Sequence, residues 1–303
     1  MILSTLDKSR KGGAYEQIPS LVLGQRWTPQ LNSRNMMKVV LCVWIEPYIE
    51  NDLSFCVWPV HTPTTSKEVL TLSASTSPLP YTGNKSCIVN TILSVMPKHT
   101  VYIDPCMGSA EVFFRKPRAE KEILNDYNGD LVNLFRVIQN NEKLAYLLGR
   151  LYLSINGELA FKQNKDRLKG VPNILDDVIE TSQIFYDASW EDIQNAAAFL
   201  ENQVYSFSST GQTFGIARRD MSQRLPRLMS AYNRIRDAII LHRDYKDVIT
   251  YAACPGSFIL LDPPYKGTED MYSKANFDIE QHDILFSFMS EVNQQHHGEV
   301  KFL

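Results

Sequence analysis

From Tyr81 onward, apolar positions fall into short runs that end in an acid or an amide and are followed by helical spacing. The first two runs predict strands over residues 100–103 and 123–124, and helical patterns follow over 109–114 and 131–138. Buried strands that alternate with helices indicate a parallel, doubly wound α/β sheet. Because ligands of such sheets bind at the carboxyl ends of the strands, functional residues are expected directly after each strand.

The pattern becomes mostly helical over residues 141–251, and the clearest predicted helix there covers 190–205, whose apolar residues share one face. The next apolar run, 258–261, leads back into the sheet. An excursion of this length is too long for a loop in a compact domain. We predict a catalytic sheet domain made of two segments with a mostly helical subdomain inserted between them: 78–140 and 252–303 for the sheet, 141–251 for the insertion.

Residues 1–77 differ from the rest of the chain. They hold three of the four tryptophans, and a stretch rich in Ser, Thr and Pro begins at Thr62 and runs to Pro80. Such a stretch is typical of a linker. We interpret residues 1–77 as an N-terminal extension of unknown role.

Composition restricts the class of protein but names no function. The 303 residues are 44% hydrophobic and 21% charged, as in globular domains. No apolar run is long enough for a membrane-spanning helix and no signal peptide is visible, so a cytoplasmic location without membrane contact is expected. The five cysteines form no C-x-x-C pair, and His296-His297 has no partners at ligand spacing, so we predict no metal site.

The tetrapeptide Asp262-Pro263-Pro264-Tyr265 follows the strand predicted over 258–261. An exocyclic amino group on a heterocycle is a poor nucleophile because its lone pair is delocalised into the ring. The Asp262 carboxylate and the Pro263 carbonyl can each accept one of its N–H hydrogens, which favours the pyramidal nitrogen of the transition state. Tyr265 offers an aromatic face for a base taken out of the duplex. A plain strand-ending turn is the alternative reading.

A second group of residues surrounds the turn after the first strand. Asp104 to Ala110 form a turn of mostly small residues, and Asp126 follows about 20 residues later, a spacing that suits ribose hydroxyls. The turn has only Gly108 where a dinucleotide site needs three glycines. A nucleoside cofactor without phosphates therefore fits better than a nicotinamide dinucleotide.

A third segment, Tyr81-Thr82-Gly83-Asn84-Lys85-Ser86, precedes a helical pattern over 88–96 and on its own is a capped helix start. Together and in this order, the three segments resemble the Dam-like family of DNA adenine methyltransferases. The resemblance runs from about Leu79 to Leu303 and includes the stretches 125–131 and 262–272. It implies a Rossmann-like methyltransferase sheet with a target-recognition insertion.

The resemblance also implies a cofactor, S-adenosyl-L-methionine, and a role for each matching residue. Tyr81 and Lys85 would contact the methionine end, and Asp126 would hold the ribose. Asp104 to Gly108 would shape the cofactor turn. Asp262 and Tyr265 fall at the catalytic positions, with Asp262 also bordering the cofactor.

The sequence departs from the family pattern in three respects. Cys106 and Ala110 stand where many members carry Phe and Gly, and the N-terminal extension precedes the usual start of the family. The chain also stops at 298–303, which resembles the beginning of a further strand. We therefore expect the last strands of the sheet to be missing and the chain to be a fragment of a longer product.

Contact with DNA has to rest on a local basic surface, because the net charge is −3. Residues 211–246 contain eight basic residues and three acids, an excess suited to phosphates. The predicted DNA-binding residues are Arg218, Arg219, Arg224 and Arg227. The polar loop 206–214 is either a groove-reading loop or a plain connector.

The sequence therefore predicts transfer of a methyl group from S-adenosylmethionine to N6 of adenine in double-stranded DNA, with the target base flipped out. Two alternatives stay open. The same turn can serve another acceptor, the exocyclic amino group of cytosine or a glutamine amide. The chain can also be a catalytically inactive, truncated DNA-binding module. The recognition sequence, the biological setting and the oligomeric state do not follow from the sequence.

Overall fold

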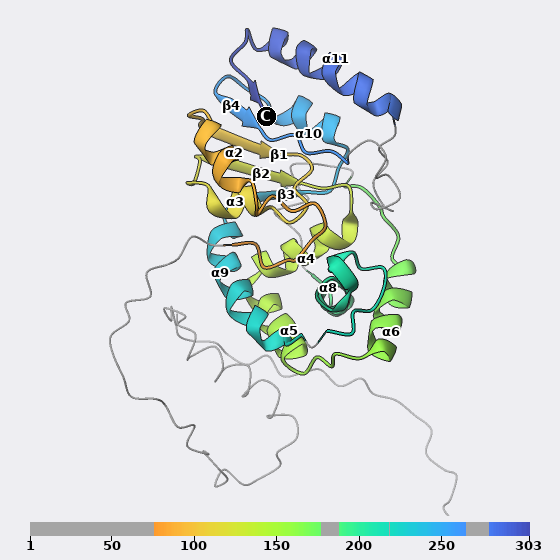
Figure 1. Cartoon of the computed structure of the whole chain (residues 1–303). Coiled ribbons are helices and arrows are strands. Elements are labelled where there is room, and N and C mark those ends of the chain that lie inside the picture. Colours follow the sequence, from red (N-terminus) through yellow and green to blue (C-terminus); the bar gives the residue numbers. More distant parts are fainter. Residues whose placement is uncertain (1–75, 177–187, 218, 265–278) are drawn as a thin grey trace, which may run out of the picture.

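The computed structural model of the chain describes residues 76–176, 188–217, 219–264 and 279–303 (Figure 1). These residues contain a five-stranded sheet in the order β3-β2-β1-β4-β5, the order of the Rossmann fold. All of its strand pairs are parallel, and Ile103 at the centre pairs with Ile123 on one side and Ile259 on the other. The strands are β1 (Val101–Asp104), β2 (Lys121–Asn125), β3 (Ile239–Leu241), β4 (Ser257–Ile259) and β5 (Lys301–Phe302).

Helices cover both faces of the sheet, which is why β1 is buried along its whole length. Tyr102 of β1 points into one apolar cluster and its neighbour Ile103 into the other, as the period of a strand requires. The first cluster includes residues of α2 (Val89–Val95), α3 (Glu111–Arg115) and α4 (Gly129–Gln139). The second includes residues of α10 (Tyr245–Ala252) and α11 (Ile279–Gln295). The predicted doubly wound α/β sheet is confirmed.

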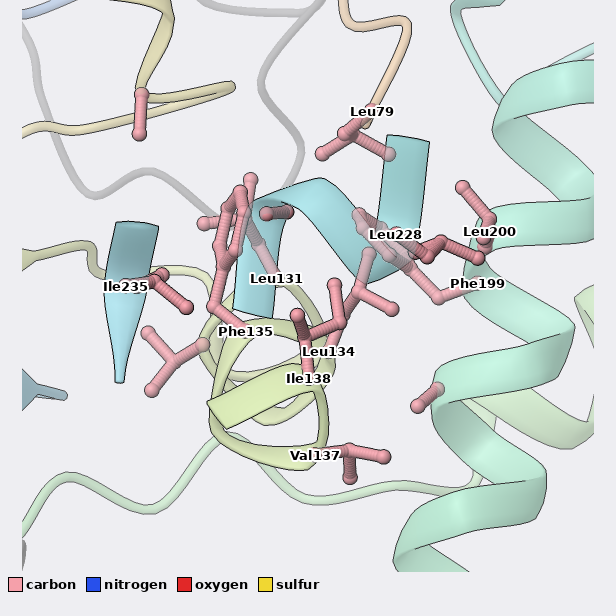
Figure 2. Packing of buried hydrophobic residues seen from close by; sticks show 14 of the residues in the cluster. Leu79, Leu131, Leu134, Phe135, Val137, Ile138, Phe199, Leu200, Leu228 and Ile235 are labelled. Carbon is pink, nitrogen blue, oxygen red and sulfur yellow. The ribbon is translucent and has the colours of Figure 1, made fainter. Parts of the chain in front are cut away.

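A helical bundle continues from α4 and lies within the range predicted as the insertion. It contains α5 (Asn141–Tyr152), α6 (Glu158–Lys169), α8 (Trp190–Tyr205) and α9 (Leu225–Ile235), with short 3₁₀ turns η2 (Phe207–Ser209) and η3 (Met221–Arg224). Helix α8 begins at a capping box between Ser189 and Asp192, and it has the bounds predicted from its apolar face. Figure 2 shows Phe199 and Leu200 of α8 packed with residues of α4 and α9, so the bundle and the sheet domain share one core.

The sequence analysis missed strand β3, which lies inside the range 141–251 assigned to the insertion and pairs with β2. The strand has three residues and follows helix α9, which contains the same types of apolar residue. The apolar run is therefore too short to be recognised as a separate strand in the sequence. Residues 239–241 therefore belong to the sheet. The division into domains otherwise stays a prediction, and the extension lies outside the described residues except for its last two positions.

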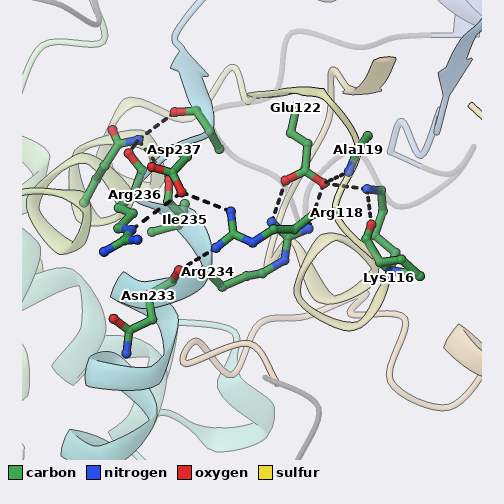
Figure 3. A network of polar contacts seen from close by, with 12 residues as sticks. Lys116, Arg118, Ala119, Glu122, Asn233, Arg234, Ile235, Arg236 and Asp237 are labelled. Atoms are coloured by element: carbon green, nitrogen blue, oxygen red, sulfur yellow. Dashed lines mark hydrogen bonds and ion pairs between the residues drawn. The ribbon is translucent and has the colours of Figure 1, made fainter. Parts of the chain in front are cut away.

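A buried ion cluster joins α9 to the start of β2 (Figure 3). The Glu122 carboxylate accepts two hydrogen bonds from Arg234, at 2.5 and 2.8 Å, and one from Lys116 Nζ at 2.6 Å. All three side chains are buried. The Arg234 guanidinium also lies 3.7 Å from the centre of the Phe113 ring. The cluster therefore ties the insertion to the sheet through side chains as well as through the chain itself.

Within the described ranges, no helix is long and apolar enough to cross a membrane.

Candidate active site

A cleft of about 390 Å³ opens at the carboxyl ends of β1, β2, β3 and β4. Its lining comes from several parts of the chain that are far apart in sequence. One wall is made by the sheet domain and is lined by residues 81–85, 104–109, 111–112, 126–128, 130, 243–245, 260 and 262–264. We call the other the insertion wall, and it is made by Lys165, Leu168, Lys169, Phe199, Asn202, Gln203 and residues 209–212.

Asp262 forms an ion pair with Lys85, which comes from the segment before α2. The Lys85 ammonium also donates a hydrogen bond to the Gly83 carbonyl at 2.8 Å. Both charged side chains are partly shielded from water, with 15% of Lys85 and 25% of Asp262 exposed. The structure therefore brings the first and the last of the three predicted segments together. Pro263 and Pro264 line the same cleft, whereas Tyr265 lies outside the described residues.

The turn after β1 lies against both Tyr81 and Asp126. Gly108 has φ +48°, and a Cβ there would lie 3.7 Å from the Tyr81 ring. The Gly108 N–H donates to the Asp126 carboxylate at 2.9 Å, and the Asn128 N–H donates to its other oxygen at 2.9 Å. Burial nevertheless raises the pKa of Asp126 above its ordinary value. The two hydrogen bonds hold the Asp126 carboxylate in one orientation beside the turn that follows β1.

Asp104 is the most deeply buried acid of this wall, with 2% of its surface exposed. Burial raises the pKa of its carboxyl group to about 8, although the Tyr102 hydroxyl donates a hydrogen bond to Oδ2 at 3.0 Å. The neighbouring carboxylates of Asp262 and Asp126 raise this pKa further. Its other oxygen, Oδ1, has no hydrogen-bond partner among the described residues.

The sequence analysis missed the loop after β3. Arg243, Asp244 and Tyr245 all line the cleft. The side-chain amide of Asn125 holds this loop, because it donates to the Pro105 and Arg243 carbonyls at 2.8 and 2.9 Å and accepts from the Arg243 N–H at 2.9 Å. Recognition of β3 as a strand would have pointed to these residues, since carboxyl ends of parallel strands meet at one edge.

The loop 206–214 is closed by a bridge between Ser206 and Phe214, and four of its residues line the cleft. Thr82 Oγ1 donates to the Ser209 carbonyl at 3.3 Å, which connects the loop to the Tyr81–Ser86 segment. Lys165 Nζ donates to the Gln212 carbonyl at 2.7 Å. The loop is therefore part of the site.

Two of the predicted DNA-binding arginines, Arg219 and Arg224, lie beside Val204 of α8 and not in the cleft. A second hollow, of about 400 Å³, is lined by Val204, Arg219, Asp220, Gln223 and Arg224. Arg219 donates a hydrogen bond to the Val204 carbonyl. Burial and the charges of Arg227 and Arg219 lower the pKa of Arg224. Arg218 lies outside the described residues, and the DNA-binding role of all four arginines stays a prediction.

Two further members of the basic stretch are engaged inside the protein. Arg234 belongs to the buried ion cluster, and Arg243 donates to the Asp176 carbonyl and lies 3.6 Å from the Asp247 carboxylate. The local excess of basic residues available to phosphates is therefore smaller than the sequence suggests.

The sheet-domain wall is acidic. Six carboxylates line it: Asp104, Glu111, Asp126, Asp130, Asp244 and Asp262. Within the described part of the chain, no three of these or other His, Cys, Asp or Glu side chains are grouped so as to hold a metal ion. The lysine of this wall, Lys85, is paired with Asp262.

Comparison with known families agrees with this arrangement. The model of the D12 class N6 adenine-specific DNA methyltransferase family matches residues 81–303, which include the whole cleft. The chain belongs to this family. The D12 match begins at Tyr81, and it confirms the resemblance inferred from the three segments.

Curated relatives of this D12 chain include DNA methylases from bacteria and a phage. It is 21% identical to modification methylase LlaI of Lactococcus lactis subsp. lactis over 73% of the chain and 36% of the relative. It is 23% identical to the DNA N-6-adenine-methyltransferase of Escherichia phage P1, over 71% of the chain and 28% of the relative. It is also 23% identical to type II methyltransferase M1.LlaDCHI of Lactococcus lactis subsp. cremoris, over 61% of the chain and 64% of the relative. The chain spans about a third of the length of the first relatives it matches.

Proposed function

We propose that the chain transfers a methyl group from S-adenosyl-L-methionine to N6 of adenine in double-stranded DNA. The observation that carries the proposal is the Lys85–Asp262 ion pair inside the cleft that also contains Asp126 and Gly108. An acid that follows β4 and a nucleoside-type turn that follows β1 are thereby placed at one site. This is the arrangement that transfer from a nucleoside cofactor to an amine requires.

The residues present fit this cofactor. Asp104 Oδ1 is buried without a described partner, and the wall around it carries six carboxylates, so a positively charged ligand stabilises the site. When bound, S-adenosylmethionine supplies an electrophilic methyl group on a sulfonium ion. Tyr81, Lys85 and Asp104 would hold its methionine end. Gly108 allows close approach of the backbone, and Asp126 would accept hydrogen bonds from the ribose.

Asp262 and Pro263 prepare the acceptor amine. The carboxylate and the Pro263 carbonyl would each accept one N–H hydrogen, which localises the nitrogen lone pair and directs it toward the methyl group. Lys85 orients the carboxylate through the ion pair. Tyr265 would stack on the base, which has to leave the duplex to reach the cleft.

DNA contact is assigned to the insertion. Arg218, Arg219, Arg224 and Arg227 would bind phosphates, and the loop 206–214 would approach the bases because it already borders the cleft. Phosphate contacts fix the position of the duplex without reading its sequence, so the recognition sequence is left open.

The test is methyl transfer from labelled S-adenosylmethionine to plasmid DNA prepared from a methylation-deficient host. We expect label in DNA, recovered as N6-methyladenine after hydrolysis to nucleosides. Asp262→Asn should lower the rate by at least about a hundred-fold, the cost of losing one well-placed transition-state contact. Asp237→Asn, which changes an exposed carboxylate outside the cleft, is the matched control.

Other outcomes separate the alternatives. Label recovered as N4-methylcytosine or as methylated glutamine in protein would replace the acceptor. An inactive DNA-binding module would shift DNA in a gel but give no heat of binding with S-adenosylmethionine in calorimetry. Transfer that is equal in the Asp262→Asn variant and the control would refute the assignment of the active site.

A further inference from the structure

We infer that Lys165 and Lys169 of α6 bind the DNA phosphates that flank the target nucleotide. Neither residue was among the predicted DNA-binding residues. The inference rests on the proposed function and adds to it which side chains hold the extruded nucleotide at the cleft.

Charge is divided unequally between the two walls of the cleft. The sheet-domain wall carries six acidic side chains, of which Asp104, with its pKa raised to about 8, is mostly protonated at pH 7. The two cations of this wall are already engaged, Lys85 with Asp262 and Arg243 with the Asp176 carbonyl. The insertion wall carries Lys165 and Lys169 and no acid among its lining residues. An organic cation is therefore favoured on one wall and an anion on the other. A nucleotide that enters the cleft carries its anionic groups on the phosphates, so the phosphates are expected on the lysine side.

Both ammonium groups are available to a phosphate. Lys165 Nζ donates to a loop carbonyl, that of Gln212. Lys169 lies 3.0 Å from the Asp166 carboxylate, but 69% of the lysine side chain and 56% of the aspartate are exposed. Exposed pairs of this kind contribute little to stability, so a phosphate can replace the aspartate. The hydrogen bond from Lys169, together with the charges of Lys162 and Lys165, lowers the pKa of Asp166, which agrees with a positive field along α6.

Lys165 and Lys169 lie four residues apart on α6, and Lys165 contacts the loop 206–214. Residues four apart in a helix lie about 5–6 Å apart on one face, so Lys165 and Lys169 act as a pair. Gln203 of α8 lines the cleft, and its neighbour Val204 lines the second hollow, together with Arg219 and Arg224. The loop 206–214 begins directly after α8, and its residues 209–212 line the cleft together with the two lysines. A duplex that meets this loop can contact lysines on the cleft side and arginines on the other.

The experiment compares three variants of the full chain in DNA binding, on a duplex whose methylated adenine has first been mapped by sequencing. The double variant Lys165→Met/Lys169→Met removes both charges but keeps good helix formers. Lys165→Arg/Lys169→Arg keeps the charges. Lys121→Met removes an exposed lysine at the amino end of β2, the edge of the sheet opposite the cleft.

Each lost phosphate contact should reduce the slope of log K against log salt by about 0.9. We expect a reduction of about 1.8 for the double Met variant, near wild-type behaviour for the Arg variant, and no change for Lys121→Met. In the same duplex, neutral methylphosphonates next to the target adenine should weaken wild-type binding and have little further effect on the double Met variant. Methylphosphonates elsewhere should weaken both proteins equally.

The outcomes distinguish the inference from the proposed function. If the wild-type chain transfers no methyl group to DNA, both fail. If it methylates DNA while the double Met variant keeps the wild-type salt slope, only the inference is overturned. A reduced slope without coupling to the flanking methylphosphonates would also overturn it, because the lysines would then hold phosphates elsewhere.

Discussion

Replacement of Arg234 by Met tests the buried ion cluster that joins the insertion to the sheet. The change removes a bidentate partner from Glu122, whose carboxylate is 6% exposed, and leaves it with hydrogen bonds from Lys116 and the Ala119 N–H. It also removes the guanidinium that lies 3.7 Å from the centre of the Phe113 ring. The Met side chain fills much of the same volume, so the loss of charge dominates the effect.

Removing one partner of a buried ion pair costs about 3–5 kcal/mol, because the other charge stays buried. Since Lys116 still donates at 2.6 Å, we expect the lower end, about 3 kcal/mol. This is a large part of the total stability of a domain, about 5–15 kcal/mol. Arg236→Met is the control, because Arg236 is the next arginine on the chain but forms an exposed pair with Asp237 at 3.5 Å. Exposed pairs contribute only about 0–1 kcal/mol.

The assay is urea unfolding followed by circular dichroism, with the free energy compared at constant m-value. Burial raises the pKa of Glu122, but the hydrogen bonds from Arg234 and Lys116 outweigh it and hold the pKa below the ordinary 4.5. A lowered pKa stabilises the fold above the ordinary value, and this contribution is lost as the pH falls through the folded value. The difference between Arg234→Met and wild type should therefore shrink as the pH falls below the ordinary pKa of 4.5. Equal losses of less than 1 kcal/mol in Arg234→Met and Arg236→Met would refute this reasoning.

Three further predictions concern the cleft. Because the pKa of Asp104 is about 8, its carboxyl group is mostly protonated at pH 7, and a bound cationic cofactor should ionise it. Calorimetry in buffers of different ionisation enthalpy should then detect the release of up to about one proton per bound cofactor. The Asp104→Asn variant should release no such proton. Gly211→Ala should raise the KM for DNA and lower the free energy of unfolding by about 1–2 kcal/mol. The reason is that Gly211 has φ +71° and that a Cβ there would lie 2.9 Å from Gln203 Nε2. An unchanged KM would show that the loop 206–214 does not contact DNA. Burial and nearby carboxylates raise the pKa of the Cys106 thiol. Iodoacetamide should therefore modify the exposed Cys87 much faster than Cys106, as measured by mass spectrometry. Equal rates at the two cysteines would contradict the effect of burial on Cys106.

Much of the fold could be predicted because local and global signals agree. The apolar runs before Asp104 and Asp262 are strands because both faces of a central parallel strand are buried, and such runs stand out in sequence. Helix α8 has the bounds predicted from its apolar face, and the structure adds a capping box at the residue where that face begins. The three residues of β3 carry no comparable signal, and their pairing with β2 depends on contacts that are distant in sequence.

The candidate site was predictable where a motif carries the chemistry, and not where the position of a side chain depends on packing. Tyr81, Lys85 and Asp262 were assigned to one site from their segments, and they line one cleft. Lys165 and Lys169 follow the ordinary spacing of an exposed helix face, so only the packing of α6 against α8 reveals that they border the cleft. Conversely, Arg234 looks like any surface arginine in the sequence, and its burial depends on Glu122.

The side-chain amide of Asn125 has a consequence for sequence change in this chain. It connects the backbones after β1 and β3, and the Asn125 carbonyl also accepts the Met107 N–H at 2.8 Å. Because the partners of Asn125 in the two loops are main-chain atoms, side chains of these loops can be replaced while the loop backbones keep their conformation. Divergence at Cys106 is thereby tolerated, whereas Asn125 itself has no substitute that offers both a donor and an acceptor at the same length.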